Sequence, residues 1–127
     1  MAMMVVALLG TGLAAYGEAA SRAHDRAKLA ELRWIGGQFQ EAIGLYYQRT
    51  PGTAKTYPAR LEDLVEDSRF LSRQRYLRRI YRDPFTGNAD WGLVPAPQGG
   101  IMGIYSLADG RPGGEFVYVP APLMRSH

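Results

Sequence analysis

The chain opens with an apolar segment that runs without a break into an amphipathic helical pattern. Residues 1–16 contain no charged side chain, and the first helix-breaking pair is Pro51 and Gly52. Between these two features, apolar residues recur at steps of three or four and so line one face of a helix. We therefore predict a single helix from about Ala2 to Gln48.

A helix of this length is too long to pack inside a small domain. It would extend roughly 70 Å at about 1.5 Å per residue. The remaining chain, about eighty residues, is near the lower limit for a self-sufficient core. We therefore expect a membrane or filament-core half over residues 1–20, an amphipathic half over residues 21–49 and a globular head over residues 50–127.

Two sets of apolar side chains lead us to expect assembly. Each large aliphatic side chain removed from water contributes about 1.5–3 kcal/mol, so an exposed row of them favours lipid or neighbouring chains. The residues expected to anchor and bundle the projecting half are Val5, Val6, Leu8, Leu9 and Leu13. The residues expected to join the helix to its head or to its neighbours are Leu29, Leu32, Ile35 and Phe39.

The apolar start has three interpretations. The first is a retained membrane anchor: sixteen helical residues span roughly 24 Å, less than the bilayer core of about 30 Å, so the segment would be a short span or a span that lacks its start. A cleaved signal peptide is the second interpretation, although no lysine or arginine precedes Arg22. A buried core helix is the third, and it would be expected to show a polar face. We favour the anchor, although the basic residues that follow it would place the head in the cytoplasm by the positive-inside rule. A basic leader upstream of Met1 would remove that objection.

The second half of the chain predicts a small mixed fold. Glycine and proline concentrate after Thr50 and indicate frequent turns. We expect a short helix over residues 57–66 and strands over residues 91–94, 101–106 and 115–119. The result is an α+β fold in which the long helix covers one face of a small antiparallel sheet. The pair Gly36 and Gly37 marks a bend or a close contact in the helix.

Arginine is concentrated in one segment of the head. Residues 69–82 contain six arginines interleaved with apolar residues, as expected for a half-buried segment. The formal net charge of the chain is only +3, which favours neither a nucleic acid nor a membrane surface. We expect these arginines to be solvated or to pair with acidic residues or lipid phosphates. A nucleic-acid patch is the weaker alternative.

The sequence offers no convincing catalytic constellation, and we predict a protein that is not an enzyme and binds no organic cofactor. It has no cysteine, which excludes disulfides, thiolate zinc sites and cysteine nucleophiles. Its histidines, His24 and His127, lack the spacing of a triad or a zinc site. Loop oxygens could hold Ca²⁺, which takes about six to eight oxygen ligands, while the alternative is ordinary turn chemistry. The loop residues in question are Asp83, Asn88, Asp90, Asp109 and Glu115.

Four stretches together resemble the type IV pilin-like proteins of the type II secretion pseudopilin class. They are the apolar start running into a helix that ends at residues 45–47, the segment 57–64, the segment 82–92, and the segment 103–110 with Gly113 and Gly114. The resemblance implies a structural subunit of the bacterial inner membrane with its head in the periplasm. Such a subunit is cut by a prepilin peptidase and bundles, with like subunits and other pseudopilins, into a filament for protein export that works with an inner-membrane secretion platform. Of the family's calcium ligands only Asp109 carries over, with Ser106 and Leu107 as weaker backbone candidates.

The chain departs from the family in two places. The family's processing motif, a glycine before the cut and a glutamate at the fifth mature position, is absent, and we expect that the true start lies upstream of Met1. Glu115 follows the Gly-Gly pair where the family carries further aspartates. Two alternatives stay open: a secreted periplasmic binding module whose first segment is cleaved, and a DNA-binding pilin-like protein of the competence type that uses residues 69–82.

Overall fold

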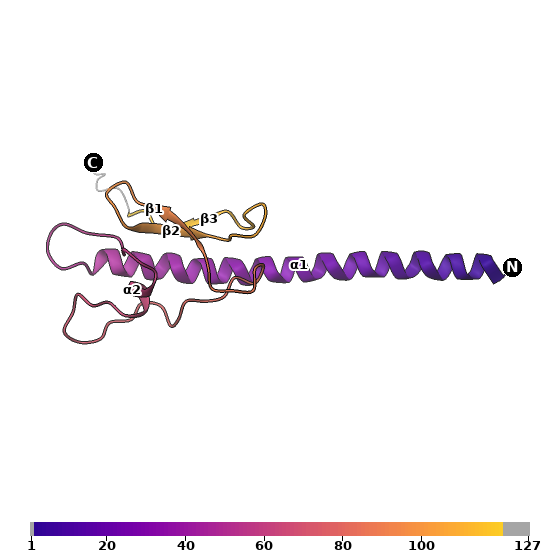
Figure 1. Cartoon of the computed structure of the whole chain (residues 1–127), viewed down its shortest axis with the longest axis horizontal. Helices are drawn as coiled ribbons and strands as arrows, with labels where there is room; N and C mark the ends of the chain where they lie inside the picture. Colours follow the sequence, from indigo (N-terminus) through magenta and orange to yellow (C-terminus); the bar gives the residue numbers. More distant parts are fainter. Residues whose placement is uncertain (1, 121–127) are drawn as a thin grey trace, which may run out of the picture.

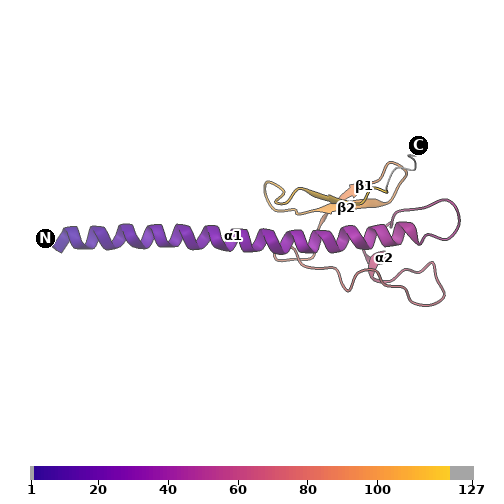
Figure 2. The same ribbon diagram turned by 180° about the vertical axis from the view of Figure 1, so that it is seen from behind.

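The computed structural model describes the backbone of residues 2–120 and the side-chain surroundings of residues 21–120. Helix α1 (Ala2–Gln48) is continuous, as predicted. The rest of the chain packs against its C-terminal half, and the N-terminal half extends well beyond the head (Figures 1 and 2). The remaining elements are α2 (Glu62–Val65), β1 (Gly92–Pro95), β2 (Ile101–Tyr105) and β3 (Glu115–Val117).

The strands form one antiparallel sheet in the order β1-β2-β3, which confirms the predicted α+β architecture. The central strand, β2, pairs Ile104 with Leu93 on one side and with Phe116 on the other. The predicted strand bounds differ from the observed ones by at most two residues. Pairing continues past β3 through the Tyr118 N–H, which donates to the Met102 carbonyl at 2.9 Å.

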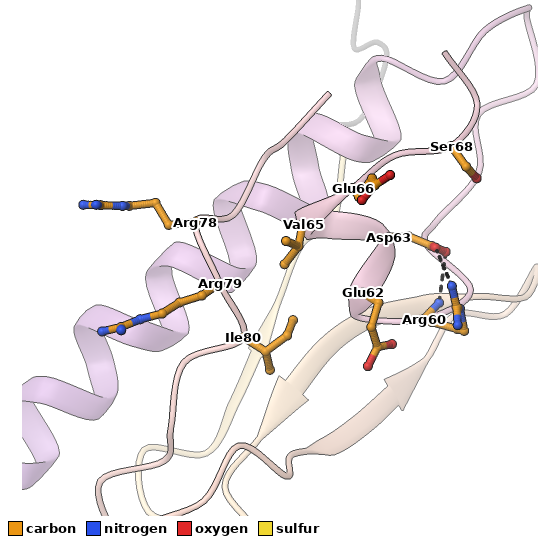
Figure 3. A pocket seen from close by; sticks show the side chains of 9 residues that line it. All are labelled: Arg60, Glu62, Asp63, Val65, Glu66, Ser68, Arg78, Arg79 and Ile80. Atoms are coloured by element: carbon orange, nitrogen blue, oxygen red, sulfur yellow. Dashed lines mark hydrogen bonds and ion pairs between the residues drawn. The ribbon is translucent and has the colours of Figure 1, made fainter. Parts of the chain in front are cut away.

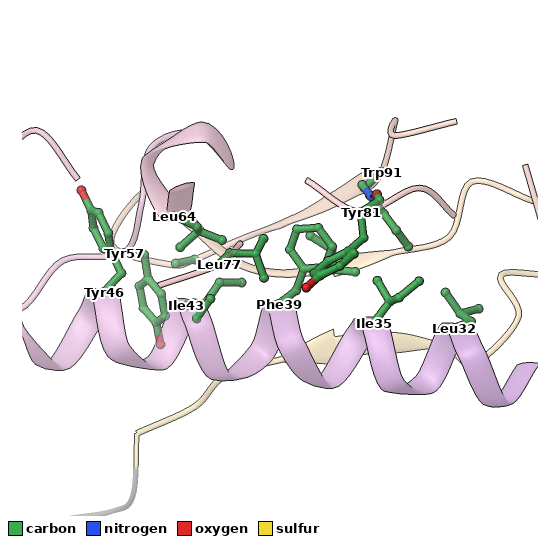
Figure 4. Close-up of a cluster of buried hydrophobic side chains, with 13 residues drawn as sticks. Leu32, Ile35, Phe39, Ile43, Tyr46, Tyr57, Leu64, Leu77, Tyr81 and Trp91 are labelled. Atoms are coloured by element: carbon green, nitrogen blue, oxygen red, sulfur yellow. The ribbon is translucent and has the colours of Figure 1, made fainter. Parts of the chain in front are cut away.

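The core lies between one face of α1 and the face of the head that packs against it (Figure 4). Phe39 is completely buried, and its ring meets those of Trp91 and Tyr81 at centroid distances of 5.3 Å and 6.5 Å. Both contacts are edge-to-face, the arrangement that aromatic quadrupoles favour. The Trp91 indole is itself held by donating to the Tyr81 carbonyl at 2.8 Å. The other large buried side chains include Leu32, Ile35, Ile43, Leu64, Leu77 and Ile104.

Local hydrogen bonds end α1. The Thr50 hydroxyl donates to the Tyr46 carbonyl at 3.1 Å, and the Lys55 ammonium donates to the carbonyls of Gln48 and Thr50. These groups satisfy carbonyls that have no partner further along the helix. A positive charge at this end is also favoured by the helix dipole.

The helical glycine pair marks a close contact and not a bend. A Cβ placed on Gly36 would lie 2.3 Å from the Phe116 side chain, whereas a Cβ on Gly37 would meet nothing within 4 Å. Gly44 makes a similar contact, with a Cβ falling 2.7 Å from the Tyr118 ring. The absence of side chains at Gly36 and Gly44 therefore lets the aromatic residues of β3 and its extension pack against α1.

Alanine substitutions at the two neighbouring glycines should have opposite effects. Gly36→Ala should destabilise the head by about 1–2 kcal/mol, since displacement of the Phe116 ring costs more than the helix propensity that is gained. Gly37→Ala should be neutral or stabilising by up to about 1 kcal/mol. Denaturant unfolding of the full chain in mild detergent, followed by tryptophan fluorescence, measures both. Equal effects would refute the close contact.

Two local predictions were wrong. The helix predicted over residues 57–66 forms only at Glu62–Val65, because the Pro58 carbonyl accepts the Ile101 N–H at 2.7 Å and so does not take part in a helical hydrogen bond. Leu71, expected to be half-buried, is fully exposed. It lies in the turn that the Asp67–Gln74 bridge closes, where no element of the head covers it.

Candidate functional site

The projecting half of α1 lacks a cover from the head in both ribbon views (Figures 1 and 2). The side chains of residues 21–27 are exposed. The predicted anchoring residues Val5, Val6, Leu8, Leu9 and Leu13 lie in the helix, but their side chains fall outside the described residues. Within the part of the chain that was described, no helix has both the length and the apolar character of a membrane span.

The second predicted set lies where α1 meets the head. Leu32, Ile35 and Phe39 are buried in the core, and Leu29 packs against its edge. Their partners include Tyr81 and Trp91, which belong to this chain's own head. In this structure these side chains therefore join the helix to the head.

A buried ion pair ties the arginine-rich segment to the end of α1. Asp67 is 2 % exposed, and its carboxylate accepts from Arg69 at 2.7 Å and 2.9 Å and from the Tyr76 hydroxyl at 2.7 Å. The same guanidinium donates to the Tyr46 carbonyl at 3.0 Å and lies 3.6 Å from the centroid of the Tyr46 ring. It also donates to the Thr50 hydroxyl at 2.8 Å. Arg69 is therefore a structural residue and not part of a free basic surface.

The pKa shifts at this site follow from these bonds. Burial by itself would raise the pKa of Asp67, but hydrogen bonds from Arg69 and Tyr76 outweigh it and lower the pKa below its usual value. Burial, followed by the hydrogen bond to Asp67, raises the pKa of Tyr76 to about 12. The carboxylate thus stays ionised and the phenol stays neutral across the physiological range.

A second buried carboxylate joins the Asp83 loop to the end of β2. Asp83 is fully buried; it accepts from the Ser106 hydroxyl at 2.5 Å and from the Phe85 N–H at 2.9 Å. Asn88 accepts from the Asp90 N–H at 3.0 Å within the same loop. These contacts are turn and packing contacts, the alternative that we set beside calcium binding.

The structure separates the remaining calcium candidates. Asp109 is exposed in the turn after β2, and Glu115 lies 3.7 Å from Arg111 in an ion pair. The Ser106 hydroxyl is engaged with Asp83. No group of three or more histidine, aspartate or glutamate side chains within the described residues converges as metal ligands would. Calcium binding at Asp109 stays a prediction.

Two hollows meet at Arg78 and Arg79. The first, about 490 Å³, has a mixed lining in which α2 contributes acidic side chains (Figure 3). In it Arg60 pairs with Asp63, while Arg78 and Arg79 extend away from α2. The second hollow, about 470 Å³, is lined by Glu31, Trp34 and Ile35 from α1 and by Arg75, Arg78, Arg79 and Tyr81.

Sequence reasoning missed Trp34 as a surface residue and Asp67 as a buried one. Trp34 is 56 % exposed, and its ring edge packs on Tyr81 with the centroids 5.6 Å apart. Its place between Arg33 and Ile35, on the flank of the apolar face, was a signal that the helical periodicity could have provided. Nothing in the local sequence indicated that Asp67 would be buried with Arg69.

Comparisons of this chain with models of protein families, with characterised proteins and with solved structures returned no match. The geometry of the chain itself therefore carries the functional argument.

Proposed function

We propose that this protein is a structural subunit that resembles a type II secretion pseudopilin and assembles through α1 into a pilus-like filament. One observation carries the proposal: a continuous helix of 47 residues whose C-terminal half alone is covered by the head. A helix of this kind can bury its other half only against lipid or against another chain.

The sequence of the projecting half supports the same proposal. It is apolar around its whole circumference up to Tyr16, so water is a poor environment for it. Gly10 and Gly12 would let neighbouring helices approach closely, as small residues do where helices pack in membranes. In the proposed arrangement the helix lies in the bacterial inner membrane or the filament core, and the head lies in the periplasm.

Membrane retention tests the anchoring part of the proposal. The full chain expressed in bacteria should stay in the membrane pellet during alkaline carbonate extraction. The double variant Leu8→Lys/Leu9→Lys should move largely to the soluble fraction, because each lysine near the centre of a span costs about 2.5–3.5 kcal/mol. Ala23→Lys, on the exposed stretch beyond the apolar segment, is the matched control and should stay in the pellet.

Cross-linking in the same cells tests assembly. The chain has no cysteine, so a single introduced cysteine reports only its own contacts. Leu9→Cys should give disulfide-linked dimers in oxidising conditions, and Thr53→Cys, in the exposed turn after α1, should give few. A wild-type chain that stays monomeric and dissolved without detergent would overturn both parts of the proposal.

N-terminal sequencing of the mature protein separates this function from a secreted binding module. A retained apolar start supports the filament subunit. A new start near residues 19–22 would support removal of the segment during export.

A further inference from the structure

We propose that Trp34, Arg75, Arg78 and Arg79 form a docking surface for an acidic segment of another protein. We call these four residues the arginine–tryptophan surface. The inference goes beyond filament assembly and does not depend on it, since the three arginines lie on the head and Trp34 lies on the half of α1 that the head covers.

The arginines of the described part of the head fall into three groups, and the first is Arg82 alone, whose guanidinium donates to the Gly87 carbonyl at 3.3 Å. Arg60, Arg69, Arg73 and Arg111 each have a carboxylate within 4 Å. Arg75, Arg78 and Arg79 are exposed, and among residues 21–120 they have neither an ion pair nor a hydrogen bond to a carboxylate. These three arginines thus line one hollow without an ion-pair partner among the described residues, and a planar carboxylate is a group that a guanidinium fork binds bidentately.

Trp34 adds an apolar contact to this charged surface. More than half of its area is in water, and its indole N–H has no hydrogen-bond partner among the described residues. Tyr81 supports it from one side at 5.6 Å and also lies 5.2 Å beneath the Arg79 guanidinium. Tryptophan, tyrosine and arginine are the residue types that are enriched among the side chains carrying most of the binding energy at protein interfaces.

The occupant is a protein and not a nucleic acid. Nucleic-acid surfaces without sequence preference stack successive bases on several aromatic rings. Here Trp34 is the one exposed aromatic ring beside the arginines in the described part of the chain. A segment that combines carboxylates with an apolar side chain matches both parts of the surface.

A second copy of this chain is a poorer match. Among residues 21–120, the carboxylates without an ion pair are spread over α1, α2 and separate loops. The exposed ones are Asp25, Glu31, Glu41, Glu62, Asp90 and Asp109, and the buried one is Asp83. No single element offers three adjacent ones, so a copy could not neutralise the three arginines together.

Peptide binding to the full chain in detergent micelles tests the proposal. The probe is a short fluorescein-labelled peptide of glutamate residues with one leucine, compared with the same peptide in which glutamine replaces glutamate. The glutamate peptide should bind more tightly, with an affinity that falls as salt rises. Binding should shift the emission of Trp34 to the blue, and this shift should be absent in Trp34→Phe because Trp91 is already buried.

Two triple variants with the same change in charge decide whether the arginines are responsible. Arg75→Gln/Arg78→Gln/Arg79→Gln should weaken binding about tenfold or more. The control Arg60→Gln/Arg73→Gln/Arg111→Gln removes three exposed, paired arginines and should weaken it by about threefold or less. Equal losses in the two variants would overturn the proposal, because they would show attraction to net charge alone.

The same binding assay tests the other possible occupants of the surface. A single-stranded oligonucleotide that binds more tightly than the peptide and needs the same three arginines would overturn the proposal in favour of a nucleic acid. Vesicles of anionic phospholipid that do so would replace it with lipid headgroups. Self-association of the full chain that Arg75→Gln/Arg78→Gln/Arg79→Gln abolishes would assign the surface to a second copy.

Discussion

Replacing Phe39 by alanine should lower the free energy of unfolding of the head by about 3–5 kcal/mol. The ring is fully buried where α1 meets the head, in edge-to-face contact with Trp91 and Tyr81. Its removal takes away both contacts and leaves a cavity that a helix and a sheet cannot close by small shifts. Denaturant unfolding of the full chain, followed by Trp91 fluorescence, measures the loss.

Two further variants make this prediction refutable. Phe39→Leu keeps most of the volume and should cost about 1–1.5 kcal/mol, so it reports on the site even if the alanine variant fails to fold. Glu41→Ala, two residues along on the exposed side of α1, should change stability by less than about 0.5 kcal/mol. A Phe39→Ala effect as small as that of Glu41→Ala would show that α1 is not part of the core.

Replacing Asp67 by asparagine should cost about 3 kcal/mol. The substitution leaves the Arg69 guanidinium in place, enclosed by Tyr46 and Thr50 without its carboxylate. The loss of stability is large because the positive charge of Arg69 would be mostly buried and no longer compensated. Asp63→Asn breaks the pair with Arg60, which is largely exposed, and should cost less than about 1 kcal/mol.

The stability difference between wild type and Asp67→Asn should depend on pH in a definite direction. The folded-state pKa of Asp67 lies below its unfolded-state value of about 3.9, so its stabilising contribution is fully present above that pH. The contribution is lost as the pH falls through the lower, folded-state pKa. The stability gap between wild type and Asp67→Asn should therefore narrow below about pH 4. A gap that is constant from neutral to acid pH would contradict an ionised pair.

The stabilising contribution of Tyr76 should change with pH in the opposite direction, since it is lost as the pH rises. Its folded-state pKa of about 12 lies above the unfolded-state value, so its contribution is complete below about pH 10 and lost as the pH rises toward 12. Tyr76→Phe should remove that alkaline component, which unfolding curves at two alkaline pH values would show.

Much of the architecture could be predicted because it follows from short-range patterns. The three-to-four-residue spacing of Leu32, Ile35 and Phe39 is enough to define the buried face of α1. Turn residues between β-branched and aromatic runs are enough to locate the three strands. The helix predicted over residues 57–66 was too long, because the Pro58 carbonyl accepts from the Ile101 N–H, a partner that lies far along the chain.

The functional surfaces divide in the same way. The apolar start and the length of the helix follow from the order of residues 1–48, and they support the assembly proposal. Which arginines are free could not be read from the segment 69–82. Arg69 is enclosed by Asp67 and the end of α1, whereas Arg78 and Arg79 extend from the head. The sequence also contained no indication that Trp34 lies in the same hollow as Arg78 and Arg79.

The long helix, the small mixed head and the three strands could be predicted from local patterns, because helical and strand periodicities depend on residues a few positions apart. Which polar side chains are buried and paired depends instead on the tertiary packing. Asp67 and Asp83 are buried by contacts between segments that are distant in the sequence, and no local sequence pattern predicts such contacts.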